Sequence, residues 1–331
     1  MPMTHRAYFG LPIRITIAVV LLFVGVGIGQ YTSAFLPGAH PDLPDQTDLA
    51  KGYHFINPLL VCSDHELSGQ TASFSQTLQD KITSRINQAK QSGDIANASV
   101  YYRELNGVAR FSVNGTMASE PASLLKVPLA LSIHRKIESQ PDFLQRKVVM
   151  NIPEQNTGEH FVAPNAAQAG KEYSVAQLLD LSLIDSDNNA TDLLITQLSD
   201  SELRNSYTDL GIQVPVDNPT NYTMDVEAYA SFFRILYNAS YLTRADSEAF
   251  LSDLSHSTFT QGLVAGVPNG TTVSHKFGEF SAPDGSKQLH DCGIVYRTGN
   301  PYLLCIMTQG NDFDKLANTI AAISKVVWDA Q

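Results

Sequence analysis

The chain has 331 residues, of which 43% are hydrophobic and 17% are charged, and its formal net charge is −11. This length and apolar content are enough for one large domain, or two lobes, with a sizeable core. The acidic balance argues against nucleic acid as a partner, because proteins that bind it carry clustered basic residues.

The first segment of the chain is basic and then apolar. His5, Arg6 and Arg14 precede the run ITIAVVLLFVGVGIG at 15–29. A retained single-pass anchor and a cleaved secretory signal both fit this pattern, and we favour the anchor slightly. Both alternatives place the rest of the chain outside the cytoplasm, because positive charge stays on the cytoplasmic side. We therefore expect residues 1–36 to be a cytoplasmic stub with an anchor, or a signal whose cleavage releases a secreted protein.

The next part of the chain changes from irregular to regular. Residues 37–70 contain four prolines and scattered aspartates without a hydrophobic period, and we interpret them as an extracytoplasmic stalk. The run at 74–90 places its apolar residues on one helical face. Two strand-like runs at 98–105 and 108–113 are joined by an Asn-Gly pair, which predicts a β-hairpin.

The remainder is mostly helical in pattern from about residue 119 to 265. Three strand-like runs then return at 271–280, 290–297 and 301–309, and a last amphipathic helix closes the chain. Strands at both ends with helices between them imply a discontinuous α/β lobe and an inserted helical lobe. A cleft between two such lobes is a natural site for a small ligand.

The three cysteines, Cys62, Cys292 and Cys305, have the spacing of neither a metal site nor a disulfide framework. Cys292 and Cys305 flank the turn RTGNP almost symmetrically, so a disulfide across paired strands is one alternative. We favour the other, in which they are two small buried apolar residues. We expect neither a metal nor a cofactor.

A Ser-x-x-Lys motif opens the apolar run PASLLKVPLA at 121–130. On a helix, residues three apart share a face, so the side chains of Ser123 and Lys126 can touch. Backbone N–H groups at the helix start would stabilise a developing oxyanion. A desolvated Lys126 would have a lowered pKa and could take the serine proton.

Two further short motifs follow. The stretch DSDNNATDLL sets Ser186, Asp187 and Asn188 after a helical run, and taken alone it is an ordinary helix N-cap. The stretch SHKFGEF sets Lys276 and Gly278 inside a strand-like run, where a lysine taken alone is typical of an edge strand.

The order of these motifs resembles the penicillin-recognising serine enzymes, which are the class A β-lactamases and the D,D-peptidases. The likeness is closest to the class A catalytic domain and covers roughly residues 70–331. It implies an α/β (α+β) fold in which an antiparallel sheet of about five strands is flanked by the N- and C-terminal helices. In this scheme the catalytic domain is 71–331, its α/β lobe is 71–118 plus 270–331, and its all-helical lobe is 119–269.

The resemblance also implies a role for each motif residue. Ser123 would be the acylated nucleophile, and Lys126 would accept or orient its proton. Ser186 would pass a proton to the leaving nitrogen, and Asn188 would hold Lys126 and the substrate's amide. Lys276 would offer positive charge to a substrate carboxylate.

The same resemblance places the oxyanion hole beside Gly278, with the backbone N–H groups of Ser123 and Glu279 as donors. The chain departs from the family at Phe277, where a threonine or serine hydroxyl usually binds the substrate carboxylate. It also lacks the loop glutamate that activates the deacylating water in class A β-lactamases. Asp217 is the one nearby carboxylate before the next helix, and it is a weak candidate for that base.

These observations leave two classes of function open. The first is an extracytoplasmic serine hydrolase, either a β-lactamase or a D,D-peptidase with poor β-lactam turnover, that acts on small molecules or peptidoglycan peptides. The second is a catalytically silent cell-surface binding domain on the same fold.

A Ser/His/Asp triad with His290 and Asp291 is conceivable, but we expect His275 and His290 to be structural. We expect a monomer that contacts the membrane only through its N-terminal segment.

Overall fold

The computed structural model describes residues 52–57, 69–215 and 222–331. The predicted anchor or signal segment and Asp217 lie outside these residues. Within the described ranges, no helix is both long enough and apolar enough to cross a membrane.

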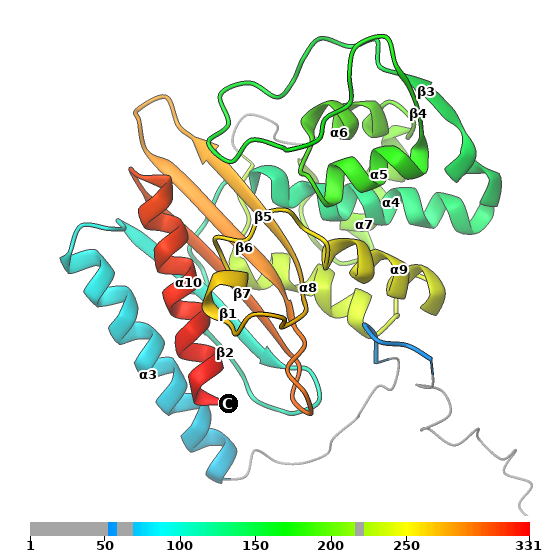
Figure 1. The fold of residues 1–331 in the computed structure, drawn as a ribbon. Helices are drawn as coiled ribbons and strands as arrows, with labels where there is room; N and C mark the ends of the chain where they lie inside the picture. Colours follow the sequence, from blue (N-terminus) through cyan, green and yellow to red (C-terminus); the bar gives the residue numbers. More distant parts are fainter. Residues whose placement is uncertain (1–51, 58–68, 216–221) are drawn as a thin grey trace, which may run out of the picture. The chain divides into compact units, whose positions relative to one another are not determined.

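A five-stranded antiparallel sheet lies at the centre of the fold, in the spatial order β2-β1-β7-β6-β5 (Figure 1). The strands are β1 (Asn97–Glu104), β2 (Arg110–Val113), β5 (Val273–Ser281), β6 (Lys287–Val295) and β7 (Tyr302–Gly310). Two strands from the early part of the chain therefore pair with three from its end, because β1 lies against β7. This arrangement confirms the predicted fold class.

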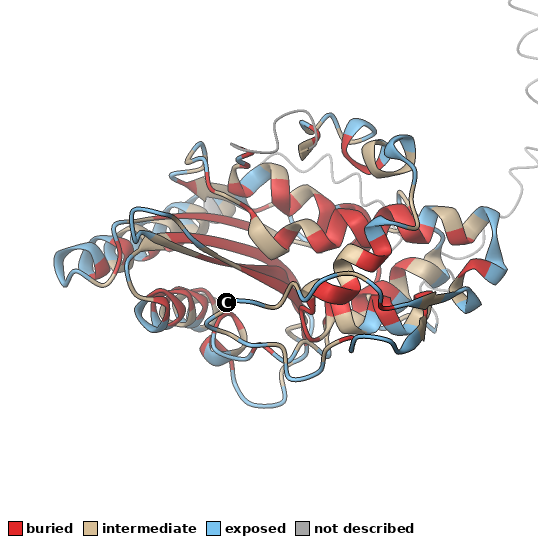
Figure 2. Cartoon of the chain, turned by 90° about the horizontal axis from the view of Figure 1, so that it is seen from above, coloured by how far each residue is buried: buried red, intermediate tan, exposed pale blue. Residues whose placement is uncertain are grey.

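The two faces of the sheet are covered by different helices. Helices α3 (Gly69–Gln91) and α10 (Phe313–Ala330) pack on one face, and α8 (Val226–Tyr237) packs on the other (Figure 1). Strand β7 shows why both faces are buried: Leu304 and Ile306 belong to the core beneath α10, whereas Leu303 and Met307 belong to the core beneath α8. Side chains of a strand alternate between faces, so an unbroken apolar run serves both cores. Figure 2 shows the buried strands between helices whose outer surfaces are exposed.

The region between the two strand groups is mostly helical, as expected. Its helices are α4 (Lys126–Ser139), α5 (Val175–Leu183), α6 (Asn188–Ile195), α7 (Asp200–Thr208), α8 and α9 (Arg244–Leu254). A short two-stranded sheet also occurs there, formed by β3 (Lys147–Val149) and β4 (Glu172–Ser174). This pair of strands was not predicted from the sequence, because three residues are too few to show an alternating pattern.

Part of the predicted stalk is docked on the folded body. The carboxylate of Glu248 on α9 accepts hydrogen bonds from the backbone N–H groups of His54, Phe55 and Ile56. The hydroxyl of Tyr296 donates to the Phe55 carbonyl at 3.0 Å. Residues 54–56 are therefore fixed through their backbone, which a sequence pattern does not reveal.

Cys292 and Cys305 are directly opposite each other on β6 and β7 and form a disulfide. The favoured interpretation of two unlinked small residues is therefore wrong. The reason is their register, because directly opposed residues of antiparallel strands bring their side chains together. Cys292 is also the register partner of Lys276 on β5, so the disulfide lies on the strand next to the one that carries this lysine.

Replacing both cysteines with alanine is expected to lower the free energy of unfolding by about 3 kcal/mol. The disulfide spans 13 positions of sequence, and closing a loop of this size in the unfolded chain has roughly that effect. Denaturant unfolding of the double variant beside the oxidised protein measures the difference. Equal midpoints and slopes would show that the two thiols are not joined in solution.

Candidate active site

Ser123 lies in a tight turn that leads directly into a helix. The turn is a 3₁₀ helix, Ala122–Leu125, and Lys126 is the first residue of α4. The sequence predicts that Ser123 lies at the start of the helix. In the structure Ser123 lies just before the α-helix, in the 3₁₀ turn. Ala122 has a φ of 47°, a left-handed conformation that costs a non-glycine residue about 1–2 kcal/mol. Such strain is typical of functional sites, where the surrounding structure holds it in place.

Lys126 is buried, with 3% of its surface exposed, and its ammonium group lies among polar partners from another element. Its Nζ donates to Ser186 Oγ at 3.1 Å and to Asn188 Oδ1 at 2.7 Å. Burial lowers the pKa of Lys126 to about 7, against the opposing effect of carboxylates that include Asp187 and Glu159. A lysine with this pKa is partly neutral at physiological pH, so it can accept a proton.

Ser186, Asp187 and Asn188 form the bend that starts α6. The side chain of Asp187 caps the helix by accepting from the N–H groups of Asn189 and Ala190. Ser186 has a φ of 62°, the second left-handed residue of the site. The N-cap interpretation is therefore right for Asp187, and this cap fixes the two neighbours that contact Lys126.

Lys276 reaches the same serine from the sheet. It is completely buried on β5, and its Nζ donates to Ser186 Oγ at 2.8 Å and to the Phe277 carbonyl at 3.0 Å. Burial, together with the nearby charge of Lys126, holds the pKa of Lys276 well below its usual range. Two lysines from two different elements thus converge on the one hydroxyl of Ser186, as the order of the motifs predicts.

Gly278 brings β5 against the turn that holds Ser123. A Cβ atom at Gly278 would lie 2.7 Å from the carbonyl oxygen of Pro121 and 3.1 Å from the backbone nitrogen of Ser123. Only glycine permits this approach of backbone to backbone. The close approach supports the predicted location of the oxyanion hole, between this strand and the Ser123 turn.

The side chain of Glu279 makes a contact that was not predicted from the sequence. Its carboxylate accepts hydrogen bonds from the backbone N–H groups of His160 and Phe161, at 3.1 and 3.2 Å. These residues belong to the loop 150–171 between β3 and β4, which reaches across to β5 (Figure 1). Glu279 therefore fixes this loop at the edge of the site.

Phe277, which replaces the usual hydroxyl residue, is 4% exposed. Its ring stacks on that of Phe259, with 4.2 Å between centroids, and the Phe161 ring meets Phe259 edge-on at 4.9 Å. Aromatic pairs at these separations stabilise a packed cluster. Phe277 is thus an apolar anchor beneath the loop 150–171, at the position where the resemblance predicts a hydroxyl.

Glu159, on the same loop, is a site residue that the sequence analysis missed. The side-chain amide of Asn188 donates to Glu159 Oε1. Burial raises the pKa of Glu159, and the charge of Lys126 opposes that rise. No motif or period marks Glu159, because its position depends on the distant contact between Glu279 and the loop.

Replacing Glu159 with glutamine is expected to shift the pH dependence of Ser123 acylation to lower pH. The glutamate's charge raises the pKa of Lys126, so an uncharged isostere leaves a more acidic lysine that is neutral at lower pH. The rate near neutral pH should rise by no more than about twofold, because about half of the lysine is already neutral there. Rate–pH profiles of both proteins provide the measurement, and a shift to higher pH would contradict this electrostatic role.

The histidines of the strands have structural partners. His275 Nδ1 lies 2.7 Å from Asp291 Oδ1 in the interior, and Asp291 Oδ2 accepts from the N–H of Leu263 at 2.8 Å. His290 Nε2 lies 2.9 Å from the Glu120 carbonyl, and burial lowers the pKa of His290 to about 4. The triad of His290 and Asp291 is therefore wrong, since Asp291 pairs with His275.

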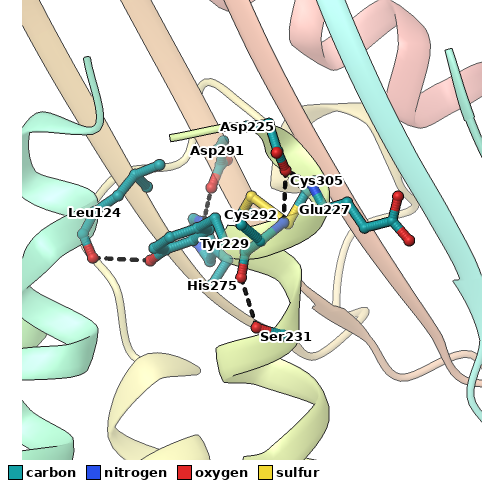
Figure 3. The surroundings of a disulfide bond; sticks show 10 residues. Leu124, Asp225, Glu227, Tyr229, Ser231, His275, Asp291, Cys292 and Cys305 are labelled. Atoms are coloured by element: carbon teal, nitrogen blue, oxygen red, sulfur yellow. Dashed lines mark hydrogen bonds and ion pairs between the residues drawn. A yellow bond between two sulfur atoms is a disulfide. The ribbon is translucent and has the colours of Figure 1, made fainter. Parts of the chain in front are cut away.

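A buried tyrosine on α8 contacts the 3₁₀ turn that carries Ser123. Tyr229 on α8 donates its hydroxyl to the Leu124 carbonyl at 3.0 Å. Figure 3 shows this contact together with the disulfide and the His275–Asp291 pair. Leu124 follows Ser123 directly, so this hydrogen bond helps to fix the turn that carries Ser123.

A pocket of about 300 Å³ opens beside Ser123, between α4, α6 and α7. Its described lining has no carboxylate. Glu227, the next acidic residue of the chain after Asp225, is exposed on α8. Asp217 lies outside the described residues, so its candidacy as a base stays a prediction.

Comparisons with known proteins agree with this geometry. The family model described as the beta-lactamase enzyme family matches residues 77–331, which is more than half of the chain. No curated protein matches the chain.

Among solved structures, PBP-A has a TM-score of 0.63 and 21% identity, and the match covers 77% of this chain and 95% of PBP-A. A variant of PBP-A, solved as an acyl-enzyme complex with penicillin G, has a TM-score of 0.61 and 20% identity. That match covers 78% of this chain and 96% of the variant. The beta-lactamase from Sphaerobacter thermophilus has a TM-score of 0.62 and 18% identity, and the match covers 76% of this chain and 96% of that enzyme. At these identities the likeness establishes a shared fold.

Proposed function

Because the chain belongs to the beta-lactamase enzyme family, we propose that it is a serine hydrolase that forms an acyl-enzyme at Ser123. Its substrates are D-Ala-D-Ala-type peptides of the cell wall or β-lactams, met outside the cytoplasm by a membrane-anchored chain. The observation that carries this proposal is the position of Lys126, which is buried, has a pKa of about 7 and contacts both Ser186 and Asn188.

The acylation step follows from these contacts. Ser123 Oγ attacks the carbonyl carbon of the substrate amide while its proton passes to the neutral amine of Lys126. The backbone N–H groups of Ser123 and Glu279 bind the resulting oxyanion, and each such donor is worth roughly 3 kcal/mol in the transition state. As the C–N bond breaks, Lys126 gives its proton to Ser186, whose own proton goes to the leaving nitrogen. The 3.1 Å contact between Lys126 Nζ and Ser186 Oγ provides this route.

The second half of the reaction distinguishes the possible enzymes. Hydrolysis of the acyl-enzyme needs a base that activates water, and the chain lacks the loop glutamate that has this role in class A β-lactamases. We therefore propose slow deacylation, which suits a D,D-peptidase or transpeptidase that β-lactams inhibit better than it suits an efficient β-lactamase. A variant of PBP-A, a protein with a similar fold, was solved as an acyl-enzyme complex with penicillin G.

Intact-mass spectrometry during incubation with benzylpenicillin tests this function. We expect an adduct that persists after free drug is removed, and no adduct in the variant Ser123→Ala. A transient adduct with consumption of the drug would identify a working β-lactamase, and Asp217 would then be the first base to replace. If no acylating substrate analogue forms an adduct with the folded wild-type protein, the alternative of a silent binding domain stands instead.

A further inference from the structure

The pocket beside Ser123 has an apolar interior built from two helices that face each other. Leu125, the last residue of the 3₁₀ turn, lies four residues before Leu129 on α4, and Leu203 and Tyr207 lie four residues apart on α7. Residues at this spacing share a helix face, so each helix contributes a pair of apolar side chains to the same cavity. Val214 completes the wall beyond α7.

Three of the polar side chains in the lining, those of Lys126, Asn188 and Thr191, already have partners. Lys126 donates to Asn188 at 2.7 Å, and the hydroxyl of Thr191 donates to the Asp187 carbonyl at 2.7 Å. A polar or charged ligand group that entered the pocket would lose its hydration and find few free partners. An apolar group would gain, because its transfer from water to such a lining is favourable.

We propose that this pocket binds an apolar substituent of the acyl group that Ser123 takes from its substrate, an inference that rests on the proposed function. Ala122 and Ser123 themselves line the pocket. A chain attached close to the acyl carbon would therefore lie beside the pocket when the serine ester forms. This assigns the enzyme a preference for donors with an alkyl or aryl side group, in addition to the features that the motif residues recognise.

The volume sets the size of the substituent. A dry protein cavity of about 150 Å³ holds one benzene molecule, and the present pocket measures about 300 Å³. It should therefore accept roughly a phenyl ring with a short linker, or an unbranched chain of about six to eight carbons. Longer chains would have to leave part of their length in water.

A series of penicillins with unbranched 6-acylamino chains of two to ten carbons tests this preference. The measured quantity is the second-order rate constant for adduct formation at Ser123, followed by intact mass. We expect it to rise about threefold to fourfold for each methylene that leaves water, and to level off at about eight carbons. Acylation that occurs at the same rate for every chain length would overturn the pocket proposal and leave the proposed function intact.

Two variants of the pocket and one control make the test specific. Leu203→Trp, at a half-buried position, is expected to fill the pocket and stop the rise at shorter chains. Ile195→Asn, at a pocket residue that is 41% exposed, is expected to flatten the rise. Val149→Asn changes a residue of similar exposure, 44%, on β3 and outside the pocket lining, and should leave the series unchanged.

The shortest penicillin serves as the internal reference, because its chain barely enters the pocket. Its rate should stay within about twofold of wild type in all three variants, and this shows that the fold and the nucleophile are intact. An unchanged chain-length series in both pocket variants, with this reference preserved, would overturn the proposal. Failure of every penicillin to acylate the folded wild-type protein would instead remove the proposed function on which it rests.

Discussion

Acylation of Ser123 by benzylpenicillin is expected to accelerate with rising pH through a midpoint near pH 7, and to fall by about a thousandfold or more in Lys126→Met. Burial lowers the pKa of Lys126 to about 7, so the amine loses its proton above this pH and becomes able to accept the proton of Ser123. General-base catalysis contributes roughly 10²–10⁴-fold. Rapid-mixing measurements of adduct formation between pH 5 and 9 give both quantities.

The stability of Lys126→Met provides the control for misfolding. The pKa of Lys126 is lower in the folded protein than in the unfolded chain, so the unfolded state binds more protons between pH 7 and about 10. This lysine therefore opposes folding at pH 7, and its contribution becomes less unfavourable as the pH rises through that window. We expect Lys126→Met to unfold at a temperature no lower than wild type. A flat rate–pH profile between pH 5 and 9 for wild type, or full activity of the variant, would contradict the role of Lys126.

Gly278→Ala is expected to lower the acylation rate about 10²–10³-fold. The new Cβ would lie 2.7 Å from the Pro121 carbonyl and 3.1 Å from the Ser123 nitrogen, and both of these atoms belong to backbone. Neither can rotate away, so the strand and the nucleophile turn must separate. The loss of one oxyanion-hole donor has an effect of this size.

The matched control for this change is Gly310→Ala, at another closely packed glycine. Its Cβ would meet Leu316 Cδ2 at 3.0 Å, the movable end of a side chain in the core beneath α10. This variant should acylate at nearly the wild-type rate. If Gly278→Ala also acylates at that rate while remaining folded, the oxyanion hole does not lie between β5 and the Ser123 turn.

Much of the fold could be predicted because its determinants are local. The turn between β1 and β2 contains an Asn-Gly pair, and most of β7 is an apolar run, YLLCIM. The Ser-x-x-Lys, Ser-Asp-Asn and Lys-x-Gly motifs are equally local, and their order along the chain sufficed to predict that they meet. The structure brings Lys126, Ser186, Asn188 and Lys276 together, and the chemical roles assigned to them stay predictions.

The features that escaped prediction depend on contacts between distant segments. Glu159 reaches Asn188 because Glu279, 120 positions later, holds the loop by two backbone N–H groups. The disulfide depends on the register of β6 and β7, and a shift of one residue would have turned the two thiols to opposite faces. Neither the hydrophobic period nor a short motif contains this information.

The two buried lysines show how function opposes stability in this site. Lys126 and Lys276 are both removed from water, and burial lowers the pKa of each. A core that served stability alone would hold apolar residues at these positions. Buried groups with displaced pKa values that meet at one hydroxyl are instead typical of an active site.

The most direct test of the central claim is to locate the benzylpenicilloyl group within the chain. Trypsin releases the peptide FSVNGTMASEPASLLK, residues 111–126, which contains Ser123 together with Ser112, Thr116 and Ser119 as internal comparisons. Tandem mass spectrometry of this peptide, after brief exposure of the folded protein to benzylpenicillin, is predicted to place the added mass on Ser123. An added mass on any other residue would contradict the assignment of the nucleophile and the mechanism built on it.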